Sequence, residues 1–152
     1  MTMKTFQGID ELEAAVGNHL GYSDWHRVTQ GQIDLFARAT GDDQWIHTDP
    51  VRAAEGPFGG TVAHGYLTLS LVPQLAWQIY CVEGVAMGVN YGSNKVRFPA
   101  PVPVGSRLRG SAELLSVTRD GDRATVVVRM TVELDSGDRP ACVAETISVL
   151  VA

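Results

Sequence analysis

The segment from Val62 to Ile79 is the most apolar part of the chain, and it constrains the fold more than any other feature. A membrane-spanning helix is the first alternative, because the run is nearly long enough to cross a bilayer. However, His64, Pro73 and several hydroxyl and amide side chains lie within it. Polar groups of this kind are costly in lipid. We therefore expect a long helix that other parts of the protein bury.

The hydrophobic pattern changes after Met87. Three later segments carry β-branched residues in near alternation with polar ones: Leu108–Val117, Ala124–Leu134 and Ala141–Val151. Clusters of aspartate and glycine separate these segments, as is typical of hairpins, so the pattern predicts an antiparallel meander. Shorter strands are predicted over Met87–Tyr91 and Lys95–Phe98, and the prolines that follow interrupt any ladder there.

Two helices are predicted ahead of the apolar run. The first covers Ile9–Leu20, where Asp10 can cap the helix and Glu13 completes a capping box. The second follows Thr29, whose hydroxyl can accept a main-chain hydrogen bond, and it ends at Gly41. The stretch between this helix and the apolar run is rich in turn formers, so we expect a loop with one short helical turn.

Together these elements predict one α+β domain over residues 1–152, with an antiparallel sheet wrapped around the long apolar helix. A sheet of this kind has open edges. Because exposed edges promote aggregation, we expect a homodimer or the N-terminal helices to cover them.

Composition narrows the classes of partner. The net charge is −5 and the 12 basic residues are scattered, whereas phosphate binding needs a clustered cationic face, so no nucleic-acid partner is expected. Cys81 and Cys142 lie in apolar stretches without metal-ligand spacing, which favours buried free thiols over a disulfide or a zinc site. The N-terminus carries no secretion signal, so we expect a cytoplasmic protein.

Residues 39–47 combine a helix end with two groups that exchange protons. Gly41 permits a bend, and Asp42 and His47 follow it closely. If the bend turns both side chains into one cavity, the carboxylate and the imidazole can activate a water molecule. Trp45 indicates that the turn is pressed against an apolar pocket. The alternative is an ordinary helix end followed by a solvated turn.

His64 and Gly65 open the apolar run. Main-chain N–H groups at a helix start stabilise negative charge on a carbonyl oxygen, and the missing side chain of Gly65 leaves room for a substrate. The structural alternative is that His64 caps the helix and that Gly65 permits tight packing. Asn94 and Arg97 are candidates for contacts with phosphate groups of a ligand, and a solvated strand edge is the alternative.

Three motifs in this order resemble those of the MaoC-like, (R)-specific enoyl-CoA hydratases. They are Phe36–His47, Ala63–Gly65 and Val96–Gly105. The resemblance implies a hot-dog fold, a homodimer and a hydro-lyase of fatty acid metabolism. Such an enzyme hydrates a trans-2-enoyl thioester of CoA or acyl carrier protein to the (R)-3-hydroxyacyl thioester, or catalyses the reverse dehydration.

The resemblance also implies residue roles. Asp42 and His47 would bind the catalytic water, and the Gly65 N–H would contact the thioester carbonyl. No metal or redox cofactor is called for, since CoA is part of the substrate. Gln44 and Trp45 stand where the family usually has Asn-Pro, a variant that resembles the nodulation-protein-N-like subgroup.

Gln44 is expected to hold Asp42 or the water in place of the missing amide. With His64, Asn94 and Arg97, it completes the set of candidate substrate-binding residues. Two alternatives stay open on the same fold: a thioesterase, in which a carboxylate activates water against the thioester carbonyl, and a non-catalytic module that binds acyl thioesters.

Overall fold

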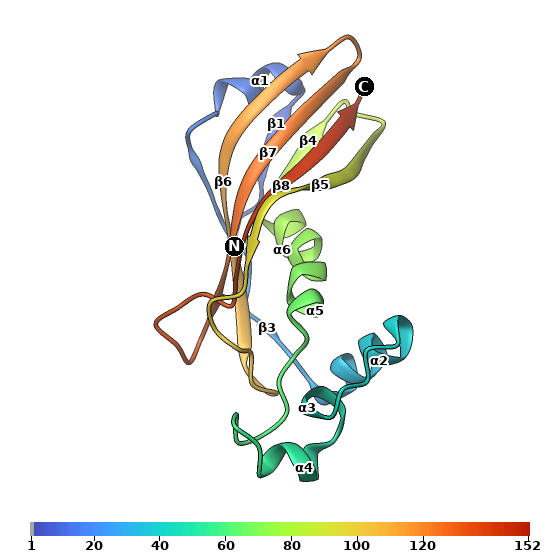
Figure 1. Ribbon diagram of the computed structural model, residues 1–152. Helices are drawn as coiled ribbons and strands as arrows, with labels where there is room; N and C mark the ends of the chain where they lie inside the picture. Colours follow the sequence, from blue (N-terminus) through green and yellow to red (C-terminus); the bar gives the residue numbers. More distant parts are fainter. Residues whose placement is uncertain (1) are drawn as a thin grey trace.

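The computed structural model describes residues 2–152. Their main feature is an antiparallel sheet curved around the helical segment of the apolar run (Figure 1). The strands of this sheet are β2 (His19–Tyr22), β3 (His26–Arg27), β5 (Met87–Arg97), β6 (Arg107–Asp120), β7 (Arg123–Leu134) and β8 (Cys142–Val151). Their order is β2-β6-β7-β8-β5, and β3 also pairs with β6. Buried positions alternate with less buried ones along β6 and β7. The predicted α+β class and the antiparallel meander are confirmed.

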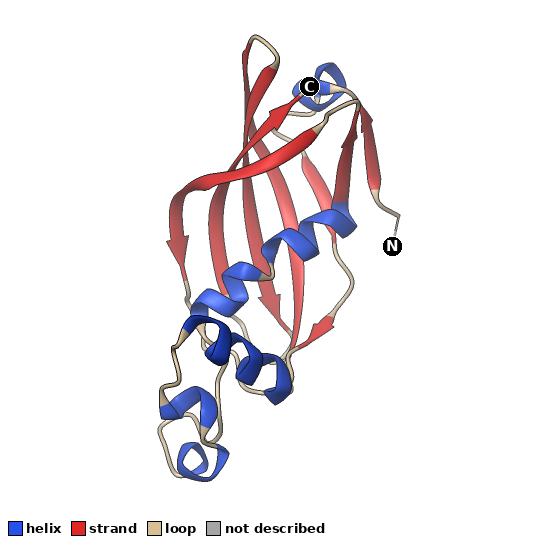
Figure 2. Ribbon diagram, turned by 90° about the vertical axis from the view of Figure 1, so that its right-hand side faces the viewer, coloured by secondary structure: helices blue, strands red, loops and turns tan. Residues whose placement is uncertain are grey.

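The apolar run forms two consecutive helices, α5 (Gly65–Ser70) and α6 (Val72–Ile79), which cross the concave face of the sheet (Figure 2). The apolar run begins at Val62, but its helix was predicted to start at or near His64, and it starts at Gly65. The reason is that Val62 pairs with Pro103 and the Ala63 N–H donates to a distant carbonyl, so this segment lies extended against the loop before β6. No helix within residues 2–152 is long and apolar enough to cross a membrane.

Helix α6 lies close to strand β6 at Gly110. A Cβ atom built on Gly110 would lie 2.9 Å from the Cβ of Leu75, closer than real Cβ contacts. Leu75 and Ile79 are at most 1% exposed and belong to the same buried core as Met130 of β7. Burial against the sheet, and not lipid, therefore explains the hydrophobicity of this run.

The N-terminal helix is shorter than predicted. Helix α1 spans Ile9–Ala14, and the chain then passes through Gly17, whose φ is 92°, into strand β2. The prediction of helix as far as Leu20 is wrong over its second half, because Leu20 is a buried strand residue. The Gly17 N–H donates to the Leu114 carbonyl of β6 at 2.8 Å, so pairing with the sheet overrides the helical spacing.

The predicted capping box of α1 is also wrong. The N-cap is Gly8, and no side chain makes a capping bond there. The carboxylates of Asp10 and Glu13 instead both pair with the guanidinium of Arg119 on β6. These acidic residues connect α1 to the sheet, which is a long-range role that local sequence patterns do not predict.

Three further differences concern strands and cysteines. Strand β1 (Lys4–Gln7) pairs in parallel with β4 (Tyr80–Glu83), and neither strand was predicted. The two short strands expected between residues 87 and 98 are one strand, β5, whose register shifts twice against β8. Both cysteines are free, as predicted, but only Cys142 is fully buried, whereas Cys81 is half-buried.

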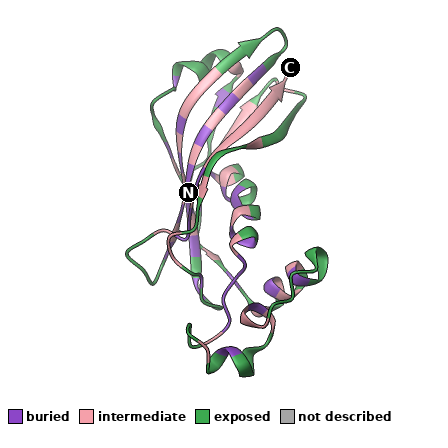
Figure 3. Ribbon diagram, in the orientation of Figure 1, coloured by how far each residue is buried: buried purple, intermediate pink, exposed green. Residues whose placement is uncertain are grey.

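Helices α2 (Gln30–Thr40), α3 (Trp45–Thr48) and α4 (Pro50–Ala54) lie beyond one end of the sheet, near the start of α5 (Figure 1). Thr29 caps α2 as predicted, since its Oγ1 accepts the Gln32 N–H at 3.2 Å. Gly41 ends α2 in the left-handed region, with φ 81°. The C-terminal end of α2 and most of α4 are exposed, whereas many of the buried residues lie in the sheet and in α5 and α6 (Figure 3).

Candidate active site

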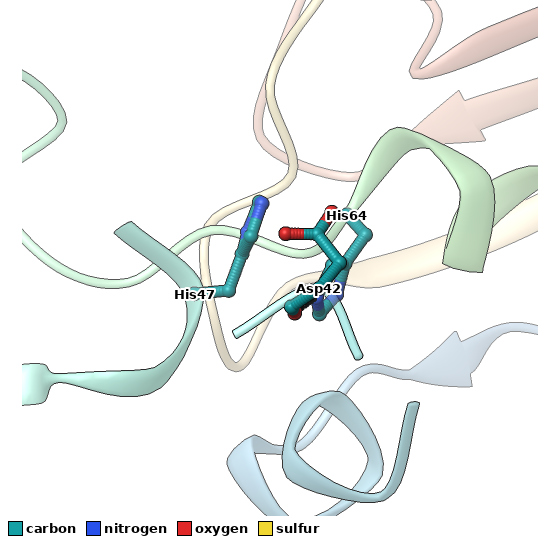
Figure 4. A group of neighbouring side chains, drawn as sticks. All are labelled: Asp42, His47 and His64. Carbon is teal, nitrogen blue, oxygen red and sulfur yellow. Dashed lines mark hydrogen bonds between the residues drawn. The ribbon is translucent and has the colours of Figure 1, made fainter. Parts of the chain in front are cut away.

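The turn after α2 brings Asp42 and His47 to the same place. The left-handed Gly41 reverses the chain, Asp42 follows in the turn, and His47 lies in the short helix α3. The side-chain ligand atoms of Asp42, His47 and His64 all lie within 4.8 Å of one another (Figure 4). Asp42 is exposed, whereas His47 is 7% and His64 is 2% exposed. A solvent-accessible carboxylate therefore faces two buried imidazoles.

The orientation of His47 is fixed by the segment that leads into α5. Its Nδ1 lies 2.6 Å from the carbonyl oxygen of Val62. Because a carbonyl only accepts, Nδ1 carries the proton, and Nε2 of the neutral ring offers a lone pair to the site. The Val62 N–H in turn donates to the Ile46 carbonyl at 3.0 Å, so the two segments are bonded in both directions.

Gln30 supports the same turn from the start of α2. Its amide nitrogen donates to the main-chain oxygen of His47 at 2.8 Å, and its amide oxygen accepts from the Thr61 hydroxyl at 2.5 Å. The sequence analysis missed Gln30 and Thr61. No local signal marks them, since their partners lie 17 and 31 residues apart in the chain.

His64 lies behind the pair and not in open substrate space. Its Nε2 donates to the main-chain oxygen of Asp42 at 2.9 Å. Its ring stacks on that of His47, with centroids 3.9 Å apart and planes 23° apart, and lies 4.8 Å from the Phe36 ring. His64 is the N-cap residue of α5 but makes no side-chain capping bond. Its contacts thus join it to Asp42 and His47.

Gly65 is the first residue of α5, so its N–H belongs to the group at a helix start that has no partner within the helix. It lines a cavity of about 270 Å³ together with Phe58, Ala63 and Phe98, among others. A Cβ on Gly65 would meet the Phe98 ring at 3.2 Å. A side chain here would therefore require the Phe98 ring to shift by a few tenths of an ångström, and the space expected for substrate in that direction is filled by this ring.

The other candidate residues lie outside this cluster. Gln44 is exposed, and it is its main-chain oxygen that accepts the His47 N–H, at 3.0 Å. Asn94 and Arg97 are exposed residues of β5, and the Arg97 guanidinium donates to the neighbouring Val96 carbonyl at 2.7 Å. No hydrogen bond within residues 2–152 links these three side chains to Asp42, His47 or His64.

Comparisons with known proteins identify the family of the chain. The chain matches the family described as MaoC like domain over residues 11–137. The 3-hydroxyacyl-thioester dehydratase Z of Mycobacterium tuberculosis (strain H37Rv) is 54% identical over 99% of this chain and 100% of its own length. Nodulation protein N of Rhizobium leguminosarum bv. viciae is 43% identical over 92% of this chain and 89% of its own.

A solved structure is similar as well. The (R)-hydratase from A. caviae involved in PHA biosynthesis aligns with a TM-score of 0.68 at 26% identity, over 88% of this chain and 94% of that one. The sheet curved around α5 and α6 is thus the hot-dog fold that the sequence motifs implied. The chain belongs to the MaoC-like family.

Proposed function

We propose that this protein is a hydro-lyase that interconverts a trans-2-enoyl thioester and the (R)-3-hydroxyacyl thioester. The observation that carries the proposal is the convergence of the Asp42 carboxylate and the imidazole of His47 on one space. Relatives named as a 3-hydroxyacyl-thioester dehydratase and an (R)-hydratase support the same reaction class. The acyl group is carried by CoA or by acyl carrier protein.

The spacing of the site suits a single water molecule. No hydrogen bond or ion pair joins the Asp42 side chain directly to either imidazole within residues 2–152, although the ligand atoms lie within 4.8 Å. One water that donates two hydrogen bonds of about 2.8 Å spans roughly 4.5 Å between its acceptors. A water held between Asp42 and Nε2 of His47 donates to both.

This arrangement supports the following proposed proton transfers. His47 orients the water by accepting one O–H, because its own N–H is committed to Val62. Asp42 removes the other proton as the water oxygen bonds to C3 of the enoyl group. The double-bond electrons move to the thioester oxygen, and the resulting enolate collapses as C2 takes the proton back from the Asp42 carboxyl. Dehydration follows the same steps in reverse.

Gly65 is the proposed donor to the thioester oxygen. Its N–H lies at the positive end of α5, beside the cavity lined by Phe98. A donor aimed at the oxygen of a developing enolate typically lowers a barrier by ~3 kcal/mol. Gln44, Asn94 and Arg97 remain candidates for contacts with the carrier, because all three are exposed.

The ligand atoms of this cluster fit water better than a metal ion. His47 and His64 are stacked with their planes only 23° apart, so their lone pairs lie in nearly parallel planes. One ion cannot lie in both ring planes unless a ring rotates and gives up its bond to a carbonyl. We therefore propose a reaction without a metal, and without a redox cofactor because hydration of a double bond involves no net oxidation or reduction.

A homodimer is the proposed assembly. Strand β5 forms an edge of the sheet, and the apolar residues Met87, Val89 and Tyr91 are exposed along it. A groove of about 820 Å³ lies next to this edge, between α6 and the sheet, and Trp77 at its border is 72% exposed. A second copy would cover this surface.

The oligomeric state tests this proposal. Light scattering of the purified protein should give twice the mass of one chain, and the Trp77→Glu variant should give the mass of a monomer.

The test is an absorbance assay for loss of the conjugated enoyl thioester, run with chiral analysis of the product. Purified protein should consume crotonyl-CoA and longer trans-2-enoyl-CoA substrates and yield the (R)-3-hydroxyacyl product. A thioesterase would instead release free CoA thiol, which a colorimetric reagent detects. Tight binding of enoyl-CoA without turnover would identify a non-catalytic module and overturn the proposal.

A further inference from the structure

Asp42 depends on His64 for its connection to the rest of the fold. The Asp42 N–H makes a long bond of 3.4 Å to the hydroxyl of Thr40, two residues away. Its carbonyl oxygen accepts from Nε2 of His64, 22 residues away, at 2.9 Å. Within the described part of the chain, this is the only hydrogen bond from Asp42 to a distant residue. The main chain that carries an exposed carboxylate is thus held in place by a buried ring.

The same ring limits the movement of His47. The two imidazoles stack with centroids 3.9 Å apart, and the ring of Phe36 lies against His64, 4.8 Å away. A stacked neighbour prevents the His47 ring from turning toward that side, since side chains in a packed interior have no free volume. His64 therefore contacts both members of the proposed pair, one by a hydrogen bond and one by stacking.

The hydrogen bonding of His64 leaves its second ring nitrogen in an unfavourable environment. Because Nε2 donates to a carbonyl, the Nδ1 of the neutral ring is an acceptor, and this atom is buried without a hydrogen-bond partner among residues 2–152. A buried acceptor that lacks a partner typically costs about 1–3 kcal/mol. A phenylalanine would fill the same space without that cost but would have no donor for Asp42. The donor is what distinguishes histidine at this position.

We propose that His64 is a positioning residue, which holds the main chain of Asp42 through Nε2–H and supports the His47 ring. It acts through these two residues and does not contact the substrate. This role rests on the proposed hydratase function and assigns a reason to the buried, unpartnered Nδ1. It replaces the earlier expectation that His64 binds substrate.

Three substitutions separate the hydrogen bond from simple packing. In His64→Gln the amide nitrogen reaches about as far as Nε2, so the bond to Asp42 can be kept. In His64→Asn the amide reaches only the position of Nδ1, and the bond is lost. His64→Phe keeps the ring and its stacking but has no donor. Thermal midpoints of all three variants establish that each is folded before kinetics are compared.

The expected order of activity is wild type, then Gln, with Asn and Phe lowest. Displacing a catalytic group by about 1 Å can cost roughly 100-fold in rate, so kcat of the Asn and Phe variants should fall by about that factor. KM should change little, because the carbonyl contact is made elsewhere. A packing role alone would make Phe the most active variant, and equal activity of Gln and Asn would equally overturn the proposal.

A second measurement does not depend on activity. Long-range 1H–15N spectra of the imidazoles should show neutral His64 protonated at Nε2 and neutral His47 protonated at Nδ1. The amide nitrogen of Asp43 shares a peptide group with the Asp42 carbonyl, so its shift should change in the Asn and Phe variants and stay near wild type in Gln. His64 protonated at Nδ1, or an Asp43 signal that is the same in every variant, would overturn the proposal even if the protein proved inactive as a hydratase.

Discussion

The imidazole of His47 is bonded through Nδ1 to the main-chain oxygen of Val62, 2.6 Å away. Val62 belongs to the extended segment directly before α5, and it returns a hydrogen bond to the turn that carries His47. The nitrogen that faces the site is therefore selected by the main chain. The segment of residues 61–64 is hydrogen-bonded to the His47 ring through Val62, to Gln30 through Thr61 and to the Asp42 carbonyl through His64.

Asp42→Asn should abolish most of the hydratase activity. The amide keeps the shape of the side chain but cannot take a proton from water, and loss of a general base typically costs about 10²- to 10⁴-fold in rate. The free energy of unfolding should be unchanged, because Asp42 is exposed and its side chain makes no hydrogen bond or ion pair within residues 2–152. Asp43→Asn, on the same exposed turn, is the matched control. Equal losses in the enoyl absorbance assay for both variants would remove Asp42 from the mechanism.

Gly65 can be tested by a pair of substitutions that differ in one donor. His64 has φ −59° and ψ 139°, which is the conformation preferred before proline, and Gly65 is the first residue of α5, where proline is tolerated. Gly65→Ala and Gly65→Pro both add a Cβ against Phe98, but only proline removes the N–H. The Phe98 ring is 41% exposed and can move aside.

Gly65→Ala should therefore lose little activity, whereas Gly65→Pro should lose about 10²- to 10³-fold in kcat, the usual effect of deleting one such donor. Circular dichroism and thermal unfolding check that both variants fold. Comparable kinetics in a folded alanine and proline pair would place the donor to the thioester oxygen at another residue.

Gln30→Leu should destabilise the protein by about 1–3 kcal/mol, because the buried hydroxyl of Thr61 and the carbonyl of His47 lose their partner. Urea unfolding measures the loss. In the double variant Gln30→Leu/Thr61→Val, part of the stability should return, since both members of the pair are then apolar. Strictly additive losses would mean that the Gln30–Thr61 bond contributes nothing.

The two cysteines should differ in reactivity. Burial raises the pKa of the Cys142 thiol to about 11, so it stays protonated at neutral pH, and thiols attack as thiolates. Cys81 is only half-buried. Because Cys81 lines the groove that the proposed second copy covers, Ellman's reagent at pH 7.5 should titrate Cys81 in the folded Trp77→Glu monomer and both thiols after unfolding. Loss of the native reaction in Cys81→Ser identifies the site, and rapid labelling of Cys142 in that variant would contradict the expectation.

Much of the fold followed from local patterns. Alternation along residues 108–117 and 124–134 predicted strands β6 and β7, and Thr29 and Gly41 predicted the two ends of α2. Both kinds of signal come from residues that are neighbours in the chain. The N-terminal helix was overestimated for the opposite reason. Its apolar spacing continues to Leu20, but Gly17 bonds to Leu114 in β6, a partner that spacing does not reveal.

The proximity of Asp42 and His47 could be anticipated from the family motif, and the bend at Gly41 gave it a physical basis. The role proposed for His64 could not be anticipated, because its bond to Asp42 spans 22 residues and its ring stacks on that of His47 in a different helix. Nor could the sequence show that a Cβ at Gly65 would meet the Phe98 ring, because Phe98 belongs to a distant segment.

By itself, the sequence determined the fold class and the reaction family, and it predicted Asp42 and His47 as the proton-exchanging pair, since these depend on periodicity and on a motif read along the chain. Tertiary structure alone decided which nitrogen of each imidazole carries the proton and which side chain supports Asp42. The reason is that those properties are set by carbonyl groups and rings that only folding brings within hydrogen-bonding or stacking distance.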